Sequence, residues 1–323
     1  MTRPFRFGIQ AFNATSAREW TDTAKAAEDS GYSCLHLADH YMGPGAAQQA
    51  AAHPVQDLAA IPAMMAAASA TSTLKVGARV MCCDYHHPVV LAKSLATIDL
   101  LSDGRLEPGF GAGWIASEYE AMGVAMDRPG IRIDRMIDYV KLARQFFAGD
   151  ELDIDTEHVT ANAMAGVPAS PQPGGPKIMM GGGGKRVLTT CGEMADIVSI
   201  NFNNKDGKIG AVGIGSSTAE MTEQKIGWIR DGAGDRFDEL EIEIGGYFAA
   251  VTDNTAATVD MMAGAMGLDA VTMAEHPHAL IGSVDEICET LQARRETYGI
   301  SYITFSQSNL EMMAPVVARL SGQ

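Results

Sequence analysis

Four consecutive glycines, Gly181–Gly184, stand between a short apolar run and two basic residues, Lys185 and Arg186. The apolar run, Ile178–Met180, is typical of a buried strand, and the residues from Val187 onward have a helical pattern. Glycine lets a ligand approach the main chain because no Cβ stands in the way. The free N–H groups and the dipole of a helix start attract phosphate, and an arginine can donate to two phosphate oxygens. The stretch predicts a phosphate-binding turn, and the alternative is a glycine-rich turn with no ligand.

An aspartate and a histidine, Asp39 and His40, follow another apolar run at Ser33–Ala38. An imidazole can give or take a proton near neutral pH, so His40 is the candidate for proton transfer. An Asp-His pair in the loop after a strand can also be a helix cap or a pair on the protein surface. The adjacent His86-His87 has no third ligand at a convincing spacing, so we expect no metal site.

Strand-like and helix-like patterns alternate along the chain, and each apolar run is followed by a helical pattern. The predicted strands lie at 5–12, 33–38, 74–83, 105–110, near 177–180, 197–200, 240–251 and 301–305. The predicted helices lie at 16–30, 58–70, 89–101, 131–147, 187–194, 216–230, 255–273, 285–298 and 312–320. This alternation predicts a single (β/α)8 TIM barrel domain over residues 1–323. The polar segments Gly149–Gly175 and Asn201–Gly215 are expected to be irregular insertions forming a lid at the C-terminal face of the barrel.

A barrel places its site at the carboxyl ends of the strands, so the residues just past each strand should converge there. Those residues are Asp39-His40, Cys82–Pro88, Gly111–Glu118, the glycine turn and Asn201–Asn204. A concave mouth with glycines on two walls suits a flat cofactor that carries a phosphate tail.

The overall composition limits the classes of partner. The chain has 323 residues, a net charge of −16 and a pI of about 4.8, which argues against nucleic acid or an anionic membrane. Five cysteines without CxxC spacing suit a reducing compartment. The first residues contain no apolar signal core, and no run is long enough to span a membrane. We expect a cytoplasmic protein that binds a small molecule and forms a homodimer or another homo-oligomer.

Several segments together resemble the bacterial-luciferase-like superfamily, in particular its branch that uses the deazaflavin coenzyme F420. They are HLADHY at 36–41, VGARV at 76–80, HPVVLAKSLATIDLLSDGRLEPGFGAGWIASE at 87–118 and KIMMGGGGKR at 177–186. The C-terminal LIGSVDEICETL and GISYITF also fit, so the resemblance covers nearly the whole chain.

The resemblance implies roles for individual residues. Asp39 would lie near the deazaflavin ring, and His40 would donate a proton or contact the substrate. Arg79-Val80 matches a position where the family often has a non-proline cis peptide behind the ring. The cofactor would be lined by Cys82, Ala112, Gly113 and Ser117, and its phosphate would be held by Gly182, Gly183, Gly184, Arg186 and Val187.

One departure from the family pattern changes the expected substrate. In the sugar-phosphate dehydrogenase of this family, a glutamate acid/base directly follows the strand-four glycines, whereas here Trp114 has that position and Glu118 lies four residues on. Pro44 replaces an active-site tryptophan of that enzyme. We therefore do not expect glucose-6-phosphate chemistry, and Trp114 is the candidate wall of the substrate pocket or a packing residue.

The predicted function is an F420-dependent oxidoreductase that moves a hydride between the deazaflavin and a small organic substrate. One alternative is an FMN-dependent luciferase-like monooxygenase that uses O2. A second alternative is a non-catalytic protein that binds flavin or deazaflavin, because fold alone does not fix function.

Overall fold

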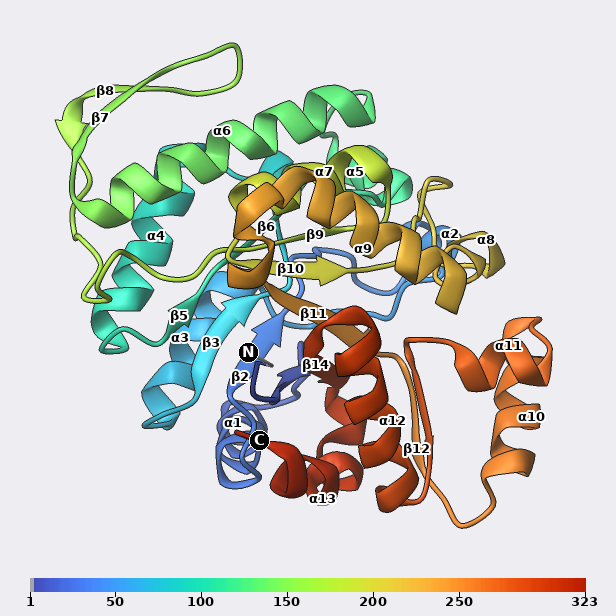
Figure 1. Ribbon diagram of the computed structural model, residues 1–323. Coiled ribbons are helices and arrows are strands. Elements are labelled where there is room, and N and C mark those ends of the chain that lie inside the picture. Colours follow the sequence, from blue (N-terminus) through green and yellow to red (C-terminus); the bar gives the residue numbers. More distant parts are fainter. Residues whose placement is uncertain (1–2) are drawn as a thin grey trace.

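Ten short parallel strands form the curled sheet at the centre of the protein (Figure 1). The computed structural model describes residues 3–323. In the order of pairing, the strands are β4 (Met81–Cys82), β6 (Gly109–Gly111), β9 (Met179–Gly182), β10 (Ile197–Ile200), β11 (Glu241–Gly246), β14 (Ile300–Ser306), β1 (Arg6–Gln10), β2 (Cys34–Leu37), β3 (Lys75–Ala78) and β5 (Leu106–Glu107). The predicted α/β class with a curled parallel sheet is confirmed.

Two of the predicted strands are interrupted. Only Arg79 and Val80 separate β3 from β4, and only Pro108 separates β5 from β6. β3 pairs with β2 and β5, while β4 pairs with β6, which in turn pairs with β9. When each interrupted pair is counted as one strand, the pairing passes through eight strands and returns to β1.

The interrupted strands approach each other so closely that two glycines are required. A Cβ on Gly77 would lie 2.1 Å from the carbonyl oxygen of Glu107, and a Cβ on Gly109 would lie 2.1 Å from that of Ala78. No side chain fits at such distances, so both positions need glycine for packing between strands. The peptide bond between Arg79 and Val80 is cis, as the resemblance implied.

Helices cover the outer face of the sheet (Figure 1). They include α1 (Ala17–Asp29), α3 (Ala60–Ala70), α4 (Pro88–Leu101), α6 (Pro129–Ala148), α7 (Lys185–Met194), α9 (Ala219–Ala233), α12 (Val284–Tyr298) and α13 (Leu310–Leu320). Their buried faces and the outward side chains of the strands form one large apolar core, and burial of this apolar surface is the main force that holds the helices to the sheet.

The outer faces of α3 and α4 carry almost no charge. α3 has no charged residue, and α4 has only Lys93 and Asp99, of which Asp99 is buried. Val90 and Leu101 are each 61% exposed on α4. These neighbouring helices therefore present an apolar outer surface on a protein of net charge −16. Within residues 3–323, no helix is both long and apolar enough to cross a bilayer.

The structure corrects several predicted boundaries. The segment predicted to be irregular at 149–175 contains an antiparallel hairpin, β7 (Glu151–Asp155) and β8 (Thr160–Ala165), which extends away from the other strands (Figure 1). In β7 only Leu152 and Ile154 are buried, so its alternation of apolar and acidic residues is the strand pattern that the prediction missed.

Other differences concern short elements and breaks. The predicted strand at 240–251 is divided into β11 and β12 (Phe248–Val251), and β12 pairs with the unpredicted β13 (Ala279–Gly282). The predicted helix at 255–273 is divided into α10 (Thr255–Met266) and α11 (Ala270–Glu275) because Gly267 ends the first part in a left-handed conformation. The short helices α2 (Ala46–Ala51), α5 (Ala116–Met122) and α8 (Ala211–Gly215) were not predicted, nor were three 3₁₀ helices at 83–85, 234–239 and 307–309.

Candidate active site

The strand ends carry the predicted site residues to one edge of the sheet. Asp39 and His40 directly follow β2, Cys82 ends β4, and Gly182 ends β9. Because β6 and β9 are paired, the two glycine-rich strand ends are neighbours.

His40 is hydrogen-bonded to a buried carboxylate, that of Glu118 on α5. Nδ1 of His40 lies 2.7 Å from Oε2 of Glu118, so Nδ1 carries the proton and donates it. The side chain of His40 is 13% exposed, and that of Glu118 is fully buried. The bond fixes the tautomer and leaves Nε2 as the ring nitrogen available for proton transfer.

Glu118 is held in the ionised form. Burial alone would raise its pKa, but the bond from His40 outweighs burial, together with bonds from the Tyr41 N–H at 2.6 Å and the Tyr85 hydroxyl at 3.0 Å. The pKa of Glu118 is therefore lowered from its usual value. A carboxylate that stays charged orients the His40 ring through this hydrogen bond.

Two aromatic rings pack against His40. The ring centroids of His40 and His53 are 4.4 Å apart, and the indole of Trp114 lies edge-on to His40 at 6.0 Å. Burial is the main cause that lowers the pKa of His53 to about 4, and the charge of the nearby His40 is the second cause. His53 is therefore neutral at pH 7. The predicted substrate residue Trp114 is thus beside the predicted proton-transfer residue.

Asp39 has one satisfied and one unsatisfied oxygen. Its Oδ2 accepts the Cys82 N–H at 2.9 Å and lies 2.7 Å from Nε2 of His86. Its Oδ1 is buried and has no hydrogen-bond partner within residues 3–323. A buried carboxylate oxygen without a partner is costly, and a ligand N–H or O–H would satisfy it.

The glycine turn forms the predicted strand, turn and helix start. Gly184 is the N-cap of α7 and provides no side-chain cap, and no acidic residue lies in the first turn of the helix. A Cβ on Gly184 would come no nearer than 3.9 Å to Asn203, so the space beside the helix start is open. Uncapped N–H groups beside open space suit an anion.

Gly183, which was predicted to hold the phosphate, also packs closely against the main chain after β10. A Cβ there would lie 2.3 Å from the carbonyl oxygen of Phe202 and 2.5 Å from the nitrogen of Asn203. Gly183 is not among the glycines with positive φ. The need for glycine at this position therefore comes from packing against the chain after β10.

Several other predicted cofactor residues already have protein partners. Arg79 pairs with Glu243 at 3.0 Å, although its Nη2 is buried without a partner among the described residues. The Ser117 hydroxyl donates to the Ala47 carbonyl at 2.8 Å. Arg186 forms an exposed ion pair with Asp134 at 2.6 Å.

The remaining predicted residues form the walls next to these groups. The carbonyl oxygens of Ala112 and Gly113 accept bonds from Arg132. Val80 and Val187 lie against the glycines of β6 and β9, since a Cβ on Gly111 or Gly182 would meet them at 2.4 and 2.5 Å.

The segment Asn201–Ser217 leads from β10 to the side of the site that holds Trp114. The N–H of Ile209 donates to the Ala51 carbonyl at 2.9 Å. At its base, Nζ of Lys225 donates to the Asn201 carbonyl at 2.7 Å and to the Ser217 hydroxyl at 2.5 Å. Burial lowers the pKa of Lys225 to about 7. The predicted irregular lid at 201–215 includes the short helix α8.

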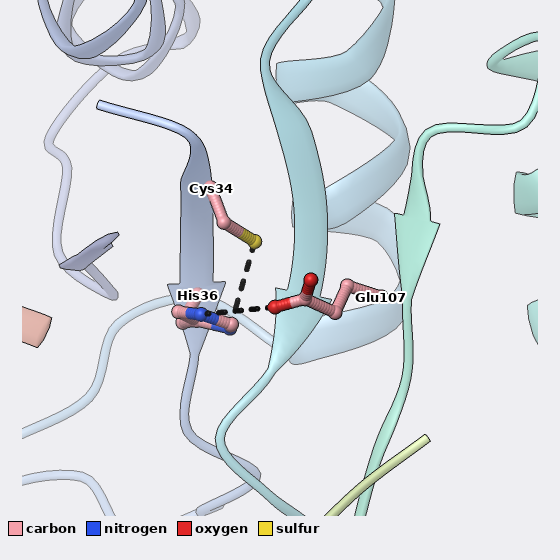
Figure 2. Close-up of side chains that lie close together, drawn as sticks. All are labelled: Cys34, His36 and Glu107. Carbon is pink, nitrogen blue, oxygen red and sulfur yellow. Dashed lines mark hydrogen bonds and ion pairs between the residues drawn. The ribbon is translucent and has the colours of Figure 1, made fainter. Parts of the chain in front are cut away.

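A second group of ionisable side chains lies inside the curled sheet. Figure 2 shows Cys34 and His36 on one strand facing Glu107. Glu107 also accepts bonds from Arg6 at 2.8 Å and from the Tyr302 hydroxyl at 3.1 Å, and Tyr302 is bonded to His36. A metal ion here would stand beside the Arg6 guanidinium, so we interpret the group as a structural hydrogen-bond network.

Sequence reasoning missed the roles of Glu118, His86 and His53. Glu118 lies in a helical turn after Trp114, which was the available signal, but no pattern linked it to His40. The link joins two residues that are 78 positions apart in sequence and that follow different strands.

The fold and the site define a parallel α/β protein with ionisable groups and a glycine turn at the carboxyl ends of its strands. A family model described as luciferase-like monooxygenase matches residues 4–214. The chain therefore belongs to the luciferase-like monooxygenase family, as its sequence motifs indicated, and it is an enzyme of that family.

Two curated relatives are similar to this chain in sequence. The chain is 28% identical over 221 residues to the 5,10-methylenetetrahydromethanopterin reductase of Archaeoglobus fulgidus, which spans 68% of this chain and 60% of the relative. It is 29% identical over 210 residues to the F420-dependent glucose-6-phosphate dehydrogenase of Gordonia bronchialis, spanning 61% of this chain and 60% of the relative.

Solved structures share the fold over nearly the whole chain. The F420-dependent tetrahydromethanopterin reductase of Methanopyrus kandleri has a TM-score of 0.72 at 17% identity and covers 98% of this chain and 100% of its own. A long-chain alkane monooxygenase has a TM-score of 0.76 at 16% identity, with 99% and 92% coverage. The part of the chain after residue 214 thus resembles the family in fold.

Proposed function

We propose that the protein is an F420-dependent oxidoreductase that transfers a hydride between the deazaflavin and a small organic substrate. The observation that supports this proposal best is the bond between His40 and Glu118 at the strand ends, next to the unsatisfied oxygen of Asp39. These residues provide a proton-transfer group and a ligand-binding group at the same edge of the sheet.

The residues present fit a cofactor of this kind. Asp39 Oδ1 would accept a hydrogen bond from the ring system, and the open N-cap at Gly184 would receive the phosphate of the tail. The other predicted lining residues, Arg79, Val80, Cys82, Ala112, Gly113 and Ser117, would surround the ring through backbone and packing contacts. When bound, the cofactor would supply the carbon that gives or takes the hydride.

His40 would move the proton that accompanies hydride transfer. Its Nε2 faces away from the bond to Glu118 and would exchange a proton with an oxygen of the substrate. Glu118 would hold the ring in the orientation that proton transfer needs, which is the function that a third group has in other acid–base sites. Trp114 and His53 would pack against the substrate and limit access of water.

The relatives favour a deazaflavin, and a flavin is the second candidate. One curated relative is named as F420-dependent, and the motifs that resemble the F420 branch include the residues of the site. The structural similarity to an alkane monooxygenase keeps an FMN-dependent monooxygenase as the alternative function. A protein that binds the cofactor without turnover is the remaining possibility.

Titration of the purified protein with F420 and with FMN, followed by absorbance and fluorescence, tests the proposal. We expect tighter binding of F420, and turnover of reduced or oxidised F420 with a panel of alcohols, ketones and enones. Preferred FMN binding with O2 consumption would support the monooxygenase instead. Binding of F420 without turnover of any substrate would leave only the binding role.

We also propose a domain organisation, a cellular location and a dimer interface for the protein. The pairing circuit described above supports one closed (β/α)8 barrel domain, and the five unpaired cysteines support a cytosolic location. The nearly uncharged outer surface of α3 and α4 is the proposed homodimer interface, because two copies with a charge of −16 can approach best where charge is absent.

A further inference from the structure

Two neighbouring residues at the end of β2 each form a bond with a group from another strand end. His40 is bonded to Glu118, which follows β6, whereas Asp39 is bonded to His86, which follows β4. The site therefore contains two separate pairs of one imidazole and one carboxylate. The proposed function uses the first pair for proton transfer and assigns no role to His86.

The contacts of Asp39 show what His86 does. Nε2 of His86 lies 2.7 Å from Asp39 Oδ2, and this nitrogen must carry the proton because an ionised carboxylate only accepts. The Cys82 N–H donates to the same oxygen at 2.9 Å. Both donors are thus on Oδ2, and the buried Oδ1 is left without a partner.

The position of His86 is itself fixed. Its carbonyl oxygen accepts a bond from the Tyr139 hydroxyl on α6. Its side chain is 13% exposed, whereas that of Asp39 is fully buried. Of the side chains that bond to Asp39 in residues 3–323, His86 is the one able to carry a positive charge.

We infer that His86 is a positioning residue that holds the Asp39 carboxylate turned so that Oδ1 accepts a hydrogen bond from an N–H or O–H of the bound ring. This inference rests on the proposed function, since the ring is that of the deazaflavin or flavin. Without His86, the buried carboxylate would lose the side chain that donates to Oδ2 and would be free to rotate. This rotation would remove an acceptor from the ligand.

Fluorescence titration with F420 and with FMN tests the inference in three single variants, which are compared with the parent protein. We expect His86→Ala to raise the Kd of the cofactor about tenfold or more, which is about 1.4 kcal/mol or more. His86→Gln keeps an N–H donor at a similar reach and should restore most of the affinity. His87→Ala is the matched control, because His87 is exposed and makes no side-chain cap to α4.

A double-mutant cycle with Asp39→Asn separates positioning from general damage to the fold. If His86 acts through Asp39, adding His86→Ala to Asp39→Asn should change the Kd less than twofold. Equal binding by the parent and the His86→Ala variant would overturn the inference and leave the proposed function intact. An undiminished effect of His86→Ala in the Asp39→Asn background would also overturn it. A parent protein that binds neither cofactor would overturn the proposed function and this inference with it.

Discussion

The N-cap of α7 allows a substitution that should raise stability and abolish cofactor binding at the same time. Gly184 has a φ of −102° and a ψ of 160°, which is extended backbone that any residue adopts. The nearest atom to a Cβ there is 3.9 Å away. A Gly184→Asp variant should therefore fold without strain and place its carboxylate on the free N–H groups of the helix start.

The substitution should raise the free energy of unfolding and lower the affinity for the cofactor. An N-cap aspartate in place of glycine should stabilise the protein by a few tenths to about 1 kcal/mol. The same carboxylate would occupy the place of the phosphate and repel it. Loss of two charge-assisted hydrogen bonds, at about 1.5–3 kcal/mol each, amounts to about 10²–10⁴ in Kd.

Denaturant unfolding and fluorescence titration of the same samples measure the two quantities. Gly184→Ala is the control for side-chain bulk without charge and should keep most of the affinity. Gly183→Ala is a poor probe of the ligand, because its Cβ would collide with the main chain of Phe202 and destabilise the protein without any cofactor. If Gly184→Asp binds F420 like the parent, the phosphate does not lie at this turn.

Five further substitutions test the rest of the site and the surface. His40→Ala should lower turnover by about 10²-fold and Glu118→Gln by about tenfold, with nearly unchanged cofactor Kd; unchanged turnover would show that the proton comes from elsewhere. Arg186→Ala should weaken binding by less than about 1 kcal/mol, since the side chain is exposed and already ion-paired, and a large effect in calorimetry would contradict this. The pKa of Lys225 in the folded protein is about 7, below its ordinary value of 10.5, so between these values the unfolded chain holds the proton and the folded protein does not. Stability should therefore rise between pH 7 and pH 10 by up to about 1.4 kcal/mol per unit, and denaturant titrations of Lys225→Met should lack that rise. Leu101→Asp should convert the proposed dimer to monomer in sedimentation, and a parent that is already monomeric would refute the interface.

The parts of the site that could be predicted from sequence are those set by neighbouring residues. The strand, turn and helix start around Gly184 follow from a contiguous pattern, and so does the position of Asp39 and His40 at a strand end. The partners of these residues could not be predicted, because Glu118 and His86 come from other strands. The pairing of β2 with β3 and of β3 with β5 brings those strand ends together.

The errors in the fold have similar causes. The hairpin of β7 and β8 was missed because acidic residues outnumber the two buried apolar ones in β7. The packing contact of Gly183 could not be predicted, because a glycine that faces a ligand and one that faces a neighbouring chain have the same sequence. The distances from a Cβ to Phe202 distinguish the two cases.

The close contact between the two interrupted strands has a consequence for how this protein can evolve. Gly77 and Gly109 each face a carbonyl oxygen at a distance that excludes any side chain, whatever ligand the protein binds. A lineage that lost its cofactor would still have to retain both glycines, whereas Gly184 would be free to change. Among descendants of this chain, drift at Gly184 beside unchanged Gly77 and Gly109 would therefore mark those that have lost the phosphate site proposed at this turn.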